Sequence, residues 1–232
     1  LTSPAGATLR FSATEAANNW TWAALTTPGS DAETGVVESS GSVIVNDKEV
    51  SLASSWFLTD QSDDRLVLEQ LVPEADLAVR RIYSFGAAAP VVRIETWVRS
   101  LSAERKLSGV SLLDLRIAGE RFRETGEAPA SFPLLGRALF VGLEHVSGEC
   151  WTGGESAHLW QAPRLTVGED WQFVAAAIVG WAPPDACSLI TGDARIRDAF
   201  VRYLDTIRIK PADLELHTNT WWSLPMTFTE AD

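Results

Sequence analysis

The sequence predicts a mainly β protein in which two antiparallel sheets pack face to face, with one α-helix late in the chain. Three observations lead to this fold class. Apolar and polar residues alternate with period two over the first two-thirds of the chain, two nearly continuous apolar runs occupy residues 138–143 and 173–179, and one helical stripe lies in 193–207. The 232 residues are enough for one large all-β domain with a sizeable core.

The clearest alternation lies between residues 92 and 99. Val92, Ile94 and Val98 occupy even positions there, whereas odd positions hold two arginines, a glutamate and Trp97. A strand with one face in water has this pattern. The preceding segment 77–85 is also β-rich, and residues 86–90 between the two contain Gly86 and Pro90. Together these segments predict a β-hairpin.

The same criteria predict strands elsewhere in the first two-thirds of the chain. In one of them, residues 107–117, Leu113 and Leu115 face one way while Asp114 faces the other. The turn-prone Asn46-Asp47-Lys48 separates two more. The remaining predicted strands cover residues 41–45, 49–53, 65–72, 138–143 and 173–179, and the last two are expected to be covered on both faces.

One segment reads as a helix, and a different pattern follows it. Asp193 is a suitable N-cap for this helix. The predicted apolar stripe consists of Ile196, Phe200, Tyr203, Leu204 and Ile207. Residues 210–213, Lys-Pro-Ala-Asp, predict a linker, and 214–223 predict a strand. We therefore divide the chain into a β domain, 1–209, and a segment of 210–232 that opens another unit.

Composition excludes several classes of partner. The net charge of −12 and the lack of a basic cluster argue against nucleic acid. The longest apolar run, 173–181, is far shorter than the roughly 20 residues of a membrane-spanning helix. The first six residues have no signal-peptide pattern, as expected for a mature or trimmed N-terminus.

Motifs for catalysis and for cofactors do not stand out. No nucleophile motif and no phosphate-binding glycine loop is present, so we expect no nucleotide cofactor. His145, His158 and His217 lack a chelating spacing, and Glu144 beside His145 would point to the opposite face of a strand. We therefore assign no metal ligands and no catalytic residues, since the many carboxylates are expected on the solvated surface.

The ten tryptophans leave two interpretations open, packing in a thick core and stacking on sugar rings. Trp97 is the strongest candidate for sugar contact, because it shares the wet face of its strand with Arg93, Glu95 and Arg99. The alternative is that a loop or a neighbouring domain covers this ring.

Cys150 and Cys187 also leave two interpretations open, a disulfide or two buried thiols. A disulfide would suit a periplasmic or secreted protein, which is the location we expect. Two reduced thiols would suit the cytoplasm instead.

Two short segments resemble landmarks of the α-galactosidase-like glycoside hydrolases of family 36. Residues 138–145, ALFVGLEH, resemble the FxGxEH strand of their N-terminal β-supersandwich. Residues 216–222, LHTNTWW, resemble the LHxNSW strand that opens their (β/α)8 barrel, with Thr220 where the family has Ser. The hairpin of 79–85 and 91–100 is similar to the central hairpin of that sandwich, and the helix falls where sandwich and barrel are linked.

The resemblance implies a galactose-mutarotase-like supersandwich over 1–209, followed by the linker and first strand of a barrel in 210–232. It implies a non-catalytic domain that packs on the barrel and completes its sugar pocket, because the catalytic aspartates of the family lie on later barrel strands. By position, Asn219 and Trp221 match family residues near the sugar. Asn219, Trp221 and Trp97 are thus the predicted substrate-binding residues, and carbohydrate and a C-terminal barrel are the predicted partners.

Two other functions remain open. One is a free-standing carbohydrate-binding module. The other is an aldose-epimerase-like enzyme, which would use His and Glu as acid and base. For the tail, we expect Trp221 and Trp222 to be exposed in a monomer or buried where two copies self-associate.

Overall fold

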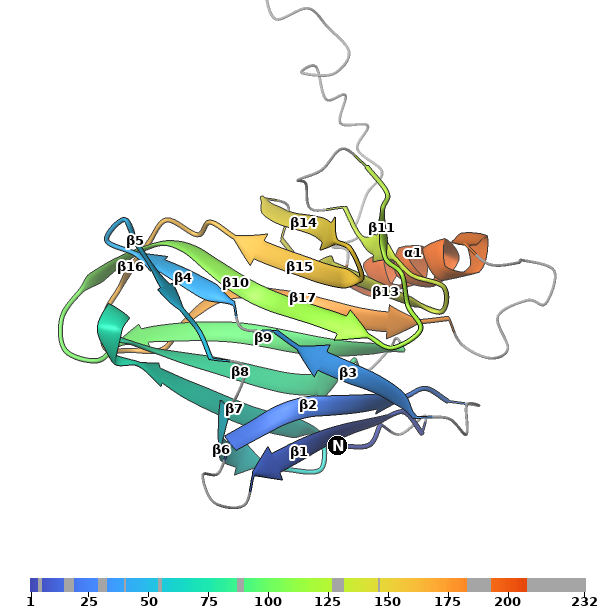
Figure 1. The fold of residues 1–232 in the computed structure, drawn as a ribbon, viewed down its shortest axis with the longest axis horizontal. Coiled ribbons are helices and arrows are strands. Elements are labelled where there is room, and N and C mark those ends of the chain that lie inside the picture. Colours follow the sequence, from blue (N-terminus) through green and yellow to red (C-terminus); the bar gives the residue numbers. More distant parts are fainter. Residues whose placement is uncertain are drawn as a thin grey trace, which may run out of the picture.

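The computed structural model describes residues 1–3, 6–14, 19–28, 33–39, 41–53, 56–86, 90–126, 132–145, 147–182 and 193–207. Within these ranges the chain forms seventeen strands, a short 3-10 helix and one α-helix, and the described strands pair only in antiparallel fashion. This confirms the predicted mainly β, antiparallel, sandwich-like fold with one late helix (Figure 1).

The elements follow one another along the chain as follows: β1 Thr8–Thr14, β2 Asn19–Thr26, β3 Thr34–Glu38, β4 Ser42–Val45, β5 Lys48–Ser51, β6 Trp56–Gln61, β7 Arg65–Val72, η1 Pro73–Ala75, β8 Leu77–Phe85, β9 Val91–Ser100, β10 Arg105–Ile117, β11 Arg123–Glu124, β12 Leu134–Leu135, β13 Leu139–Leu143, β14 Gly148–Gly153, β15 Ser156–Gln161, β16 Leu165–Val167, β17 Gln172–Trp181 and α1 Asp193–Ile207.

The strands form two layers that share β3 (Figure 1). The first sheet has the order β1-β2-β6-β7-β8-β9-β17-β13-β12-β11. The second sheet has the order β14-β15-β10-β4-β5, with β16 beside β15 along the same edge of β10. Because β3 pairs with both β2 and β10, the two layers form one strongly curled sheet.

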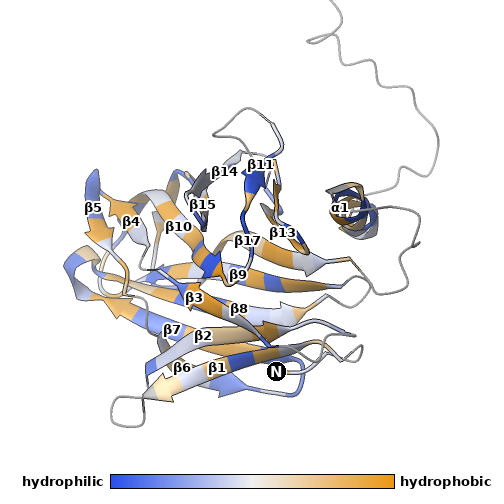
Figure 2. Cartoon of the chain, turned by 45° about the vertical axis from the view of Figure 1, so that its right-hand side comes forward, coloured by the Kyte–Doolittle hydropathy of each residue, from blue (hydrophilic) through white to orange (hydrophobic). Residues whose placement is uncertain are grey.

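The predicted hairpin is confirmed as β8 and β9, which pair along their whole length. Along β9 the even positions 92–100 are buried and the odd positions from 93 to 99 are half-buried, as the alternation predicted. Figure 2 shows this change between apolar and hydrophilic residues along the strands of both layers. The apolar side chains of the two sheets meet between the layers and form the main core.

Other predicted elements are confirmed closely. Strand β7 and helix α1 have the predicted bounds. Asn46 and Asp47 join β4 to β5 with φ angles of 48° and 64°, as in a type I′ hairpin turn. No strand was predicted from the sequence at the positions of β1, β2, β3, β6, β11, β12 or β14 to β16.

Helix α1 covers one end of the outer face of the first sheet and makes a second, smaller apolar cluster with it. Ile196, Ala199 and Tyr203 are buried there against Phe140 and Ile178. The predicted apolar stripe extends further than this contact, since Ile207 is 46% exposed.

The main core contains one buried ion pair, between Arg81 and Glu38. The hydroxyl of Tyr83 donates to Glu38 at 3.4 Å, and the Arg81 guanidinium lies 4.4 Å from the ring centre of Trp56. Burial raises the pKa of Tyr83. These charges have their partners inside the core and face no solvent.

Several predictions fall outside the described residues. They concern Cys187 and the whole of 210–232, including Asn219, Trp221 and Trp222. Among the helices that the structure describes, none is long and apolar enough to span a membrane.

Candidate functional site

The strongest candidate site is a groove of about 550 Å³ on the outer face of the second sheet, which we call the aromatic groove. It runs across β14, β15, β10, β4 and β5. Its lining residues are Ser39, Gly41, Ser42, Ile44, Glu49, Ser51, Ser111, Asp114, Trp151, His158 and Trp160.

The hairpin of β14 and β15 supplies the aromatic rings. Cys150 and Leu159 point into the core, so their neighbours Trp151, His158 and Trp160 point outward. Trp151 and His158 are directly opposite each other in the register. Their rings stack with centroids 5.4 Å apart and an interplanar angle of 13°.

A β-bulge in β10 brings two polar side chains onto this face. Ser111 pairs with Trp160 and Leu113 pairs with Leu159, so Leu112 is an extra residue in the register. Without the bulge, Ser111 and Asp114 would lie on opposite faces, because they are three residues apart. In the structure both face outward, and the Ser111 hydroxyl donates a hydrogen bond to Asp114 Oδ2.

The same carboxylate orients the histidine. His158 Nδ1 lies 2.7 Å from Asp114 Oδ1. A carboxylate only accepts hydrogen bonds, so Nδ1 carries the proton in this pair and a neutral ring keeps its lone pair on Nε2. The side chains of His158 and Asp114 are 26% and 13% exposed, so the pair is reachable at the groove surface.

Gly109 makes room for Trp160. A Cβ atom at this position would come within 2.1 Å of the Trp160 ring. The indole therefore lies directly against the backbone of β10, and it also forms part of the groove lining.

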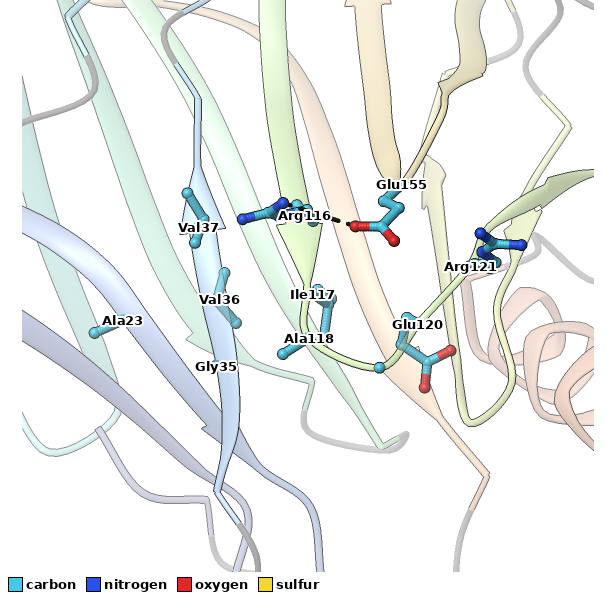
Figure 3. A pocket seen from close by; sticks show the side chains of 11 residues that line it. Ala23, Gly35, Val36, Val37, Arg116, Ile117, Ala118, Glu120, Arg121 and Glu155 are labelled. Atoms are coloured by element: carbon cyan, nitrogen blue, oxygen red, sulfur yellow. Dashed lines mark ion pairs between the residues drawn. The ribbon is translucent and has the colours of Figure 1, made fainter.

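A second hollow, of about 590 Å³, lies where β3 meets the end of β10 (Figure 3). Arg116 and Glu155 form an ion pair of 3.7 Å beside it. Glu120 accepts hydrogen bonds from the backbone N–H groups of Arg137 and Ala138, and burial is the largest influence on its pKa, which is raised. None of the described residues that line this hollow is aromatic, so it is the poorer candidate for sugar stacking.

Trp97 lies elsewhere, on the outer face of the first sheet. As predicted, Arg93, Glu95 and Arg99 share this face with it and are half-buried. The Trp97 Nε1–H donates to Glu95 Oε2 at 2.8 Å, and the ring meets Phe173 edge-on with centroids 5.3 Å apart.

The same face carries a stack of arginine and tryptophan. The guanidiniums of Arg80 and Arg99 lie 4.0 and 5.0 Å from the ring centre of Trp171. We call Arg80, Trp97, Arg99, Trp171 and Phe173 the arginine face.

Towards α1, Arg93 forms two ion pairs on this outer surface. Arg93 Nε lies 2.8 Å from Glu144 Oε2, and Arg93 also pairs with Glu95. The Tyr203 hydroxyl donates to Glu144, and burial together with this bond raises the pKa of Tyr203.

The structure therefore does not bring Trp97 into the aromatic groove, since the two lie on different sheets. The groove residues were not predicted from the sequence. One signal could have found them: Gly154-Glu155 is a hairpin turn, and the residues on both sides alternate, with Trp151, His158 and Trp160 on one face. His145, by contrast, interacts with Ser147 and does not join Glu144 in a site.

Within the described ranges no group of three or more His, Cys, Asp or Glu side chains is arranged to hold a metal ion. The groove thus offers aromatic faces, hydroxyls, a histidine and carboxylates as its chemistry. Comparison with protein-family models and with curated proteins found no match to this chain.

Proposed function

We propose that this chain is a non-catalytic carbohydrate-binding domain of a glycoside hydrolase, and that it holds sugar in the aromatic groove. One observation carries the binding part of this proposal. The rings of Trp151 and Trp160 line one groove together with the hydrogen-bonded set of Ser111, Asp114 and His158.

Sugar rings need this combination of surfaces. The C–H side of a pyranose is apolar and packs on a flat aromatic face, while its hydroxyls need fixed hydrogen-bond partners. Trp160 is held against Gly109 and Trp151 is stacked on His158, so the aromatic surfaces are rigid before a sugar arrives. Preorganised groups lose little conformational entropy on binding.

Titration calorimetry with neutral oligosaccharides tests the binding part. We expect heats of binding with the native chain and their loss in the Trp160→Ala variant. Phe173→Ala is the matched control, because Phe173 is 42% exposed on the opposite sheet. If no glycan gives heat at millimolar concentration, the chain is not a carbohydrate-binding domain.

The assignment to a glycoside hydrolase rests on the resemblance of 138–145 and 216–222 to family 36. The isolated chain should then show no glycosidase turnover, whereas the chain extended through a following barrel should release sugar from an α-galactoside. Turnover by the isolated chain would overturn the non-catalytic role.

A second candidate is an aldose-epimerase-like enzyme, and the contact between His158 and Asp114 in the groove favours it. Such an enzyme needs an acid and a base that both reach one sugar ring. A mutarotation assay on galactose and glucose separates the two functions. We expect no rate above buffer, and a rate abolished by His158→Ala would establish the epimerase instead.

A further inference from the structure

We infer that the aromatic groove accepts uncharged glycans and rejects uronic-acid and other anionic glycans. This inference rests on the proposed function and goes further by naming the chemical class of sugar.

The charges that line the groove are of one sign. Glu49 and Asp114 are carboxylates, and no lysine or arginine is among the described residues that line the groove. Proteins that bind anionic sugars or phosphates do so with arginine forks and lysine ammonium groups. An anionic sugar in this groove would lose water beside two carboxylates and gain no cation in return.

The cations on the surrounding strands do not alter this balance. On β10, Arg116 pairs with Glu155 and Arg105 pairs with Asp76. Lys106 is exposed near the start of β10, and Lys48 is exposed at the start of β5. Neither lysine belongs to the groove lining.

Hydrogen-bond roles point the same way. Glu49, Asp114 and the Nε2 atom of a neutral His158 are acceptors. A sugar hydroxyl can donate to each of them, whereas the carboxylate of a uronate only accepts. A neutral pyranose thus matches the charge of the groove and can donate to these acceptors, whereas the carboxylate of a uronate is repelled by Glu49 and Asp114 and cannot donate to them.

Matched pairs of glycans test the inference by calorimetry with the full chain. The neutral probes are gluco-, galacto-, manno- and xylo-oligosaccharides, and the anionic probes are oligouronides of glucuronic, galacturonic and mannuronic acid of the same lengths. We expect the best neutral glycan to bind at least tenfold more tightly than any uronide.

Charge variants identify the cause. Glu49→Lys should strengthen uronide binding at least fivefold, and Glu49→Gln should give a smaller gain in the same direction. Glu74→Lys is the control with the same charge change, because Glu74 is exposed in η1 and does not line the groove. This variant should leave both glycan classes within twofold of the native chain.

The outcomes separate this inference from the proposal beneath it. Uronides that bind as tightly as neutral glycans, or more tightly, would overturn charge selection and leave a carbohydrate-binding domain. If uronide binding improves equally in Glu49→Lys and Glu74→Lys, the net negative charge of the whole protein weakens uronide binding, and the groove itself does not select by charge. Failure of both glycan classes to bind would overturn both proposals.

Discussion

The two outer faces of the sandwich both present tryptophan among charged residues, yet they differ in what those residues contact. On the first sheet, Arg93 is paired with Glu144 and Glu95, and Trp171 lies between Arg80 and Arg99. On the second sheet, Ser111, Asp114 and His158 bond to one another but line an open groove. An aromatic residue on a wet strand face is therefore a binding candidate only where neighbouring polar groups and its own ring face remain accessible.

The largest expected effect concerns the ion-paired end of the first sheet. Tyr203→Ala removes a ring that is 3% exposed and leaves Glu144 without its hydroxyl donor, so the free energy of unfolding should fall by about 3 kcal/mol. Urea denaturation measures this change. Glycan affinity, measured below the transition, should stay within twofold.

The control for this prediction is Val201→Ala, since Val201 is 44% exposed on the same helix. A similar loss of stability in both variants would mean that α1 is weakened as a helix and not through its contact with Glu144.

The next effect concerns the groove and should show the opposite behaviour. Trp160→Ala should weaken glycan binding about thirtyfold, or about 2 kcal/mol, because it removes one stacking surface. The thermal midpoint should change little, since this ring lies on the outer face. If Trp160→Ala keeps native glycan affinity but lowers the thermal midpoint, Trp160 has a structural role and does not bind sugar.

The next prediction concerns the inner face of the β14–β15 hairpin, where Cys150 is buried in the core, and the dependence of stability on pH. Burial raises the pKa of the Cys150 thiol to about 12. The pKa of this thiol is higher in the folded chain than in the unfolded chain, where it is near 9. The unfolded chain therefore loses the proton first, so the contribution to stability is complete below about pH 9 and is lost as the pH rises from about 9 to 12. At pH 10 the loss should be about 1 kcal/mol.

Urea denaturation at pH 8 and pH 10 measures the effect, with Cys150→Ala as the control for the other groups that titrate in this range. The two proteins should show different pH slopes. Equal slopes would contradict a buried thiol and agree with a disulfide to Cys187. Such a disulfide would also keep Cys150 from reacting with thiol reagents when the chain is unfolded without reductant.

The smallest effect sets the expectation from the sequence that Trp97 contacts sugar against the proposal that the aromatic groove does. Because its Nε1 already binds Glu95 and its edge packs on Phe173, we expect Trp97→Ala to cost about 1 kcal/mol of stability and to leave glycan affinity unchanged. Paired calorimetry and denaturation on this variant and Trp160→Ala make the comparison direct. A loss of affinity in Trp97→Ala equal to that in Trp160→Ala would place the sugar on the first sheet.

Local patterns were enough to predict much of the fold. The hairpin of β8 and β9, strand β7 and helix α1 were predicted because their apolar periodicity and turn residues agree over eight or more positions. Strands β3 and β16 give too few alternations to detect alone, whereas the equally short β4 and β5 were predicted because turn-prone residues separate them.

The groove could not be derived from alternation alone. A period-two reading places Ser111 and Asp114 on opposite faces, and only the extra residue in the β10 register reverses this. The difference between the two outer faces is equally hidden in the sequence, since ion pairs such as Arg93 with Glu144 join residues far apart in the chain.

The position of β10 has a consequence for the order in which the chain folds. One edge of β10 pairs with β3 and β4, which precede it, and the other pairs with β15 and β16, which follow much later. During synthesis, therefore, β10 can join its earlier partners while its second edge still presents unpaired backbone groups. Protein fragments that end between Ile117 and Ser156 would keep that edge open, and intermolecular strand pairing there would make them prone to aggregate.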